Sequence, residues 1–279
     1  MRHPSKTDIM AMEKRCIYCA APHTTVEHMP PISMFRGRKR PDGLVFAGCA
    51  ACNNGTSAAD LVAGFVARLS PRYDQDGWKI AEAKARGSIL EAQAPGFLGE
   101  FYDPSRRRTE WLPTPSGIRR QMTVMDLSGP LTRAYLEVFA AKLGMALYRH
   151  HCGHPLPLNG FVMCGAYTNA GLAPDTAQVL LSIMPDQSGL RQGRRNHVDD
   201  QFIYRFNTDG RSLVAALAQF HDGLYVSVMA FSGTEPYGQP PPNHRRVQPG
   251  DLPGMMPFRS RPWAIQKALL IKPPGVTPS

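Results

Sequence analysis

Three short motifs follow one another near the start of the chain: Cys-Ile-Tyr-Cys at residues 16–19, Val-Glu-His-Met-Pro-Pro at 26–31 and Cys-Ala-Ala-Cys-Asn at 49–53. A C-x-x-C pair closes a tight turn that points two thiolates at one metal ion. Two such pairs favour a shared ion over a redox pair or disulfides. We therefore expect a structural zinc ion with closed coordination, which does no chemistry itself. Its four predicted ligands are Cys16, Cys19, Cys49 and Cys52.

The middle motif places a carboxylate beside an imidazole. Glu27 and His28 end a short extended run, and Pro30 and Pro31 bias the following backbone away from helix. Neighbouring side chains on a strand point to opposite faces, so the pair converges on one substrate only if the chain turns or bulges there. The prolines favour such a turn. Asn53 follows the second cysteine pair and leads into a predicted helix.

In this order the motifs resemble the HNH endonucleases, and more narrowly a group of uncharacterised bacterial HNH proteins with an EH-x-PP and a C-x-x-CNN pattern. The similarity covers residues 14–70, about a fifth of the chain, and implies a zinc-stapled ββα-metal core, or His-Me finger. It implies that His28 is the general base and that Glu27 and Asn53 hold a catalytic divalent ion. Asp42 stands where the family's middle asparagine shapes the loop. The chain has Glu where Asp is commoner, and Asn where many members have His.

These residue types fit phosphodiester hydrolysis. An imidazole accepts a proton from water near neutral pH, and a cation neutralises the charge that develops on the leaving oxygen. Glu27 and the Asn53 carboxamide are hard oxygen donors, which suit Mg²⁺ or Mn²⁺. Each residue also has a structural alternative. Glu27 is then a solvated charge, His28 a hydrogen-bonded strand histidine, and Asn53 a helix cap or a left-handed turn residue.

The charge of the chain points to an acidic partner. The formal net charge is +10, and arginine offers a two-pronged donor that matches phosphate. The loop between the predicted base and the second cysteine pair is a candidate nucleic-acid contact, with a solvated charge run as the alternative. Its basic residues are Arg36, Arg38, Lys39 and Arg40. Because no apolar run reaches the length of a signal peptide core or a membrane span, we expect a soluble cytoplasmic protein.

The rest of the chain predicts an α+β fold in which the zinc-stapled core precedes a mixed helical and antiparallel-strand module. Ser57 to Asp60 matches a helix start signal, and apolar spacing predicts a long helix over 131–150. Strands are predicted at 161–164, 179–183, 202–206 and 224–228, with turns at 207–210 and 221–223 that favour antiparallel pairing. The predicted units are a nuclease core at 14–70, a helical and loop connector at 71–130, an α+β module for substrate recognition at 131–235 and a proline-rich tail at 236–279.

The expected function is metal-dependent endonuclease activity on nucleic acid, with DNA favoured over RNA on resemblance alone. The alternatives are a zinc-ribbon nucleic-acid-binding protein without catalysis and an interaction module whose charge keeps it in solution. Glu27, His28 and Asn53 discriminate among them, because a protein that only binds has no reason to place all three around one cation.

Overall fold

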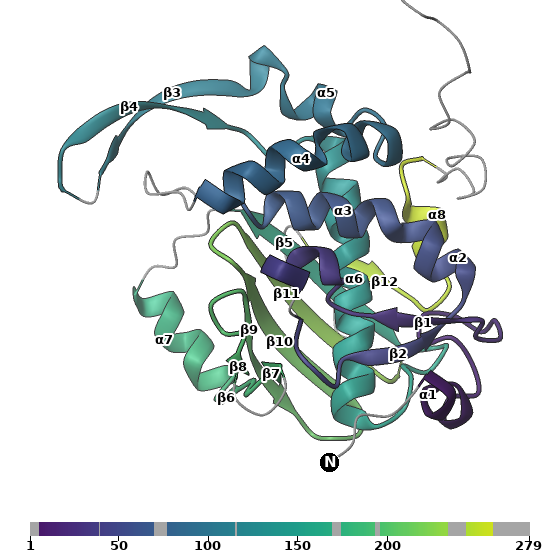
Figure 1. Cartoon of the computed structure of the whole chain (residues 1–279). Coiled ribbons are helices and arrows are strands. Elements are labelled where there is room, and N and C mark those ends of the chain that lie inside the picture. Colours follow the sequence, from purple (N-terminus) through teal and green to yellow (C-terminus); the bar gives the residue numbers. More distant parts are fainter. Residues whose placement is uncertain are drawn as a thin grey trace, which may run out of the picture.

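The structure is a computed structural model, shown in Figure 1, and it describes residues 6–38, 40–69, 77–114, 116–168, 174–192, 196–233 and 244–258. Lys39, the predicted helix end at Ser70-Pro71 and most of the predicted tail lie outside the described residues. Within them the fold is α+β with antiparallel sheets, as the sequence predicts.

The largest element is a six-stranded antiparallel sheet with the order β12-β5-β11-β10-β9-β6. Its strands are β5 (Phe161–Thr168), β6 (Asp186–Gln187), β9 (Phe202–Thr208), β10 (Leu213–Phe220), β11 (Leu224–Phe231) and β12 (Arg245–Val247). Burial alternates strictly along β10, where Val214, Ala216, Ala218 and Phe220 are buried and the residues between them are half-buried. One face of the sheet therefore forms the core.

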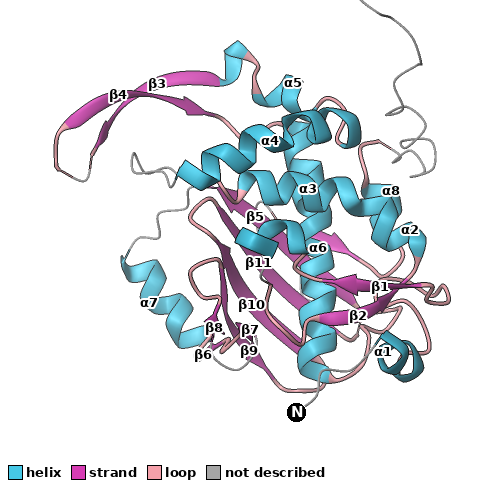
Figure 2. Cartoon of the chain, in the orientation of Figure 1, coloured by secondary structure: helices cyan, strands magenta, loops and turns pink. Residues whose placement is uncertain are grey.

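That face is covered by the long helix α6 (Pro130–Cys152), which packs on β5, β10 and β11 (Figure 2). Gly144 lets the helix approach the sheet, since a Cβ at this position would lie 2.5 Å from Val162 Cγ1. The helix ends at Gly153, which adopts a left-handed φ of 79°. The prediction of a helix over 131–150 is confirmed.

A two-stranded hairpin and several helices lie on the other side of α6. Strands β1 (Thr25–His28) and β2 (Val45–Gly48) pair antiparallel, and α3 (Ser57–Val66) packs on α6. The start of α3 at Ser57 confirms the predicted helix start. The other helices of this part are α1 (Lys6–Met12), α2 (Ala50–Asn53), α4 (Gly77–Gln93), α5 (Phe97–Phe101) and α8 (Leu252–Met255), with single turns at Ile32–Met34, Arg36–Arg38, Asn54–Thr56 and Pro104–Arg106.

Two further pairs of strands lie outside the main sheet. Strands β3 (Arg107–Pro113) and β4 (Arg119–Met125) form a long hairpin that projects from the body in Figure 1. Strands β7 (Arg191–Gln192) and β8 (Asn196–His197) form a short ladder. The segment predicted as a helical and loop connector thus holds a β-hairpin as well as helices.

Three of the four predicted strands are confirmed as β5, β9 and β11, and they pair antiparallel. The strand predicted at 179–183 is wrong, because these residues form the end of helix α7 (Pro174–Ile183). Its apolar run is short enough to fit either structure, and Pro174 at the first helical position favours the helix. One apolar cluster runs from Cys16 to Leu252, so the predicted segments share a core.

Candidate metal and catalytic site

The four cysteines of the two C-x-x-C pairs come together in one cluster. Cys16 and Cys19 lie in the turn after α1, Cys49 precedes the first residue of α2, and Cys52 lies within that helix. Their sulfur atoms all lie within 4.8 Å of one another, and the Sγ atoms of Cys19 and Cys49 are 3.6 Å apart. Tetrahedral coordination with bonds of about 2.3 Å requires sulfurs roughly 3.8 Å apart. The cluster can therefore hold a zinc ion.

The surroundings favour the ionised form of at least one sulfur. The pKa of Cys16 is lowered to about 5, mainly by a hydrogen bond with the Cys52 thiol, and the same hydrogen bond raises the pKa of Cys52. The backbone N–H of Tyr18 also donates to Cys16 Sγ at 3.4 Å. Arg15 donates to the carbonyl oxygens of Cys16 and Cys19, and to that of Leu156 at 2.6 Å, beyond the end of α6. The first cysteine turn is thus fixed to the rest of the molecule.

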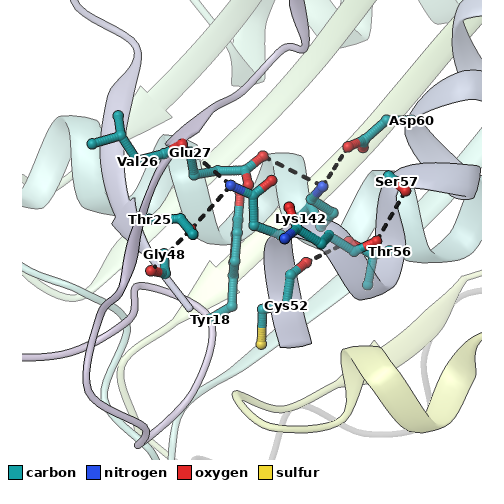
Figure 3. Close-up of polar contacts among 12 residues, drawn as sticks. Tyr18, Thr25, Val26, Glu27, Gly48, Cys52, Thr56, Ser57, Asp60 and Lys142 are labelled. Atoms are coloured by element: carbon teal, nitrogen blue, oxygen red, sulfur yellow. Dashed lines mark hydrogen bonds and ion pairs between the residues drawn. The ribbon is translucent and has the colours of Figure 1, made fainter. Parts of the chain in front are cut away.

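Glu27 does not face solvent, so the alternative in which it is a solvated surface charge is wrong. It is 2% exposed, and its carboxylate contacts Lys142 of α6 at 3.4 Å (Figure 3). Lys142 is fully buried and donates to Asp60 of α3 at 2.6 Å. The Lys142 ammonium also lies 5.9 Å from the centre of the Tyr18 ring. We name Glu27, Asp60 and Lys142 the buried charge cluster.

The buried charge cluster carries one negative charge too many when both carboxyl groups are ionised. Burial raises the pKa of Glu27 to about 7 despite the nearby Lys142, and it also raises the pKa of Asp60. The pKa of Lys142 is raised, because attraction to the two carboxylates outweighs its burial. Among the described residues, Glu27 Oε2, Asp60 Oδ1 and the Tyr18 hydroxyl are buried without a hydrogen-bond partner. The cluster is thus short of one proton or one further cation.

Asn53 is the last residue of α2, which follows β2, and its side chain contacts β1. Its side-chain nitrogen donates to Thr25 Oγ1 at 3.1 Å and to the Val26 carbonyl at 3.2 Å. Gly48 separates Asn53 from Glu27, since a Cβ built there would lie 3.4 Å from Glu27 Cβ and 3.7 Å from Asn53 Cβ. Glu27 and Asn53 therefore lie on either side of the same glycine.

The donor chemistry of this pair fits a hard divalent ion. One oxygen of the Glu27 carboxylate has no partner among the described residues, and the Asn53 carboxamide adds a second oxygen donor. The other Glu27 oxygen is engaged by Lys142. Because the free oxygen is buried, a cation reaches it only when the side chains around it shift.

His28 lies on the other face of β1. The β1–β2 register is regular through the pair of His28 and Val45, so no bulge turns His28 toward Glu27. Its side chain is half-buried, and its pKa is lowered to about 4 by burial and, secondarily, by Arg40. The imidazole is therefore neutral at physiological pH and available as a proton acceptor. The strand ends at His28 and is followed by a cis peptide bond between Met29 and Pro30.

The basic loop is only partly described. Arg36 is exposed, and its backbone N–H donates to the Gln201 side chain at 2.6 Å. Arg40 is half-buried beside His28. The side chain of Arg38 and the whole of Lys39 lie outside the described residues. Among the described side chains of this loop, Arg40 lies close enough to His28 to lower its pKa.

Sequence reasoning missed two members of the buried charge cluster. The sequence places Asp60 in a helix start signal, whereas in the structure its carboxylate accepts a hydrogen bond from Lys142. Lys142 falls on the apolar stripe of its helix, between Phe139 and Leu143. A lysine on a buried face needs an anionic partner, so this position was the signal that could have revealed the cluster.

No protein-family model, curated protein or solved structure matches this chain. In the described part of the chain, the four cysteines are the only group of three or more Cys, His, Asp or Glu side chains placed to hold a metal ion. No helix in that part is long and apolar enough to cross a membrane.

Proposed function

We propose that this chain is a zinc-stapled, metal-dependent endonuclease of the HNH type that hydrolyses phosphodiester bonds of nucleic acid, with DNA favoured on resemblance. One observation carries the proposal. Glu27 of β1 and Asn53 of α2 both lie beside Gly48, and β1 ends in the neutral His28. The Cys16, Cys19, Cys49 and Cys52 cluster supports it, because a zinc ion bound there would join the helix that bears Asn53 to the turn that precedes β1.

In this function His28 accepts the proton of the attacking water. The low pKa of His28 keeps its imidazole free of a proton before substrate binds. A phosphate bound near Arg40 offsets that arginine's charge, so the imidazolium that forms during the reaction is less disfavoured.

Glu27 and Asn53 would hold Mg²⁺ or Mn²⁺ through their oxygen atoms. Such an ion supplies charge neutralisation at the leaving oxygen when it is bound. Lys142 keeps Glu27 partly ionised in its buried setting, because its ammonium opposes the effect of burial on the carboxyl pKa. Part of the Glu27 population is therefore ionised near neutral pH, as coordination of a cation requires.

A second candidate function is nucleic-acid binding without cleavage. It is favoured by the ion pair with Lys142, which gives Glu27 a structural role, and by the position of His28 on the opposite face of β1 from Glu27. The zinc cluster and the basic surface would then serve binding alone.

The two functions are separated by a cleavage assay on supercoiled plasmid and labelled RNA with Mg²⁺ or Mn²⁺. We expect wild type to cleave, and we expect His28→Ala to lose at least about 100-fold in rate, since general base catalysis contributes about 10²–10⁴-fold. His197→Ala is the matched control, because that histidine is exposed on β8. Binding without cleavage by wild type would favour the second function. Equal cleavage by both variants would point to a contaminating nuclease and contradict the role of His28.

A further inference from the structure

The projecting hairpin of β3 and β4 carries two unlike faces. Residues directly opposite in an antiparallel pair share a face, and successive residues alternate between faces. Leu112, Met122 and Val124 fall on the inner face, where they are half-buried, and the same face carries Glu110 and the exposed Arg108 and Arg120. The outer face carries the half-buried Met125 opposite Arg107, and its exposed residues all offer a positive charge, a hydrogen bond or an aromatic ring. They are Arg107, Thr109, Trp111, Arg119, Gln121 and Thr123.

The two arginines of the outer face differ from their neighbours in charge pairing. Arg106 pairs with Asp126 at 3.5 Å and Arg108 with Glu110 at 2.6 Å. Arg107 and Arg119 form no salt bridge with a carboxylate in the described part of the chain. They donate instead to the carbonyl oxygens of Tyr102 and Trp111. Their charge is thus held on the hairpin without being neutralised by a direct ion pair.

Trp111 lies between these charges and is 60% exposed. A large aromatic ring left in water on a projecting hairpin gains free energy when it is covered by a flat partner. Stacking on a base or sugar covers it, while phosphates accept hydrogen bonds from guanidinium groups. A strand of seven residues spans about 20 Å, which corresponds to roughly six nucleotide steps.

We propose that the outer face of the β3–β4 hairpin binds a nucleic-acid strand, with Arg107 and Arg119 on phosphates and Trp111 stacked on the strand. The proposal rests on the proposed function only for the kind of partner, since the hairpin lies apart from β1 and β2 in Figure 1. The hairpin adds a second contact with the substrate, so it acts on affinity and not on the proton transfer at His28.

The test measures binding of fluorescent duplex and single-stranded DNA by anisotropy, with the full chain in the His28→Ala background and in wild type without added divalent ions. Trp111→Ala is expected to weaken binding by about tenfold. Arg107→Gln and Arg119→Gln are each expected to lower the slope of log affinity against log salt by about 0.9 on duplex, or 0.7 on single strands. Arg211→Gln, an exposed arginine beyond the end of β9, is the control and should change neither.

Shielding of Trp111 gives a second measurement that does not depend on affinity. A Trp78→Phe, Trp263→Phe protein keeps Trp111 as its one tryptophan, because the chain has 3. Bound DNA should protect this tryptophan from quenching by acrylamide. Unchanged affinity, salt slope and quenching on both kinds of strand would overturn the proposal, as would the absence of any binding by wild type. If the hairpin variants weaken binding but wild type does not cleave, the hairpin proposal stands and the nuclease proposal is rejected. If wild type cleaves but the hairpin variants bind as tightly as wild type, the nuclease proposal stands and the hairpin proposal is rejected.

Discussion

At the residue scale, Glu27 is the group whose setting most constrains the chemistry. Its carboxyl pKa rises from 4.5 to about 7 on folding, because burial disfavours the charged form. The folded state therefore holds a proton that the unfolded chain has lost between these values. Stability contributed by protonated Glu27 is fully present below about pH 4.5 and is lost as pH rises through about 7.

Glu27→Gln removes this titration while keeping the shape of the side chain. Since one pKa unit corresponds to about 1.4 kcal/mol, the variant should gain up to about 3 kcal/mol relative to wild type between pH 4.5 and pH 8. Urea unfolding across this range, in buffer without divalent ions, measures the difference. Comparison with wild type cancels the opposing effect of His28, whose folded pKa is lowered. A constant difference across the range would show that Glu27 does not titrate on folding.

At the same scale, a proton bound to Glu27 can be distinguished by experiment from a metal ion bound to Glu27. A cation on Glu27 replaces the proton, so Mn²⁺ binding by wild type should release protons and tighten as pH rises through about 7. Glu27→Gln should abolish this dependence. Binding of Mn²⁺ measured by calorimetry in two buffers of different ionisation enthalpy gives the proton count. Mn²⁺ binding that persists unchanged in Glu27→Gln would place the ion elsewhere.

At the element scale, Lys142 joins three elements, because it lies on α6 and contacts both β1 and α3. Lys142→Met keeps an unbranched side chain, one heavy atom shorter, and leaves two buried carboxyl groups without their cation. We expect a loss of about 3–5 kcal/mol in unfolding free energy at pH 8, since removing one member of a buried ion pair leaves an uncompensated charge. The combined Glu27→Gln, Asp60→Asn, Lys142→Met variant should recover much of it. Chemical denaturation of both variants tests this, and equal losses would mean that charge is not the cause.

An element could be predicted from the sequence when the pattern that marks it lies within a few consecutive residues. The α6 helix and the antiparallel strands follow from spacing and turns within a few residues, so the sequence predicted them. The β3–β4 hairpin was missed because its exposed strands lack the apolar alternation that marks a half-buried strand. The cysteine cluster was predictable because C-x-x-C fixes geometry locally. The partners of Glu27 were not, since Asp60 and Lys142 meet it only through the packing of α3 on α6.

At the scale of the whole molecule, the cysteine cluster is part of the fold rather than an appendage. All but the half-buried Cys19 are buried members of the apolar cluster that continues through α6 to the sheet. Arg15 and the backbone of Gly250, which donates to the Tyr18 carbonyl at 2.8 Å, connect the cluster to distant parts of the chain. Loss of the metal is therefore expected to destabilise parts of the molecule beyond the β1–β2 hairpin.

Removal of zinc should accordingly lower the stability of the entire chain in one cooperative transition. Loss of a structural metal belongs to the few changes that cost more than about 4 kcal/mol, which for a chain of this size is a fall in Tm of at least about 8 °C. Calorimetry after treatment with a chelator measures it, with Cys16→Ser as the genetic equivalent and Cys152→Ser, outside the cluster, as the matched control. Metal analysis should find one zinc per chain in wild type and in the control. An early transition confined to part of the chain, with the main one unmoved, would mean that the cysteine cluster folds independently of the sheet.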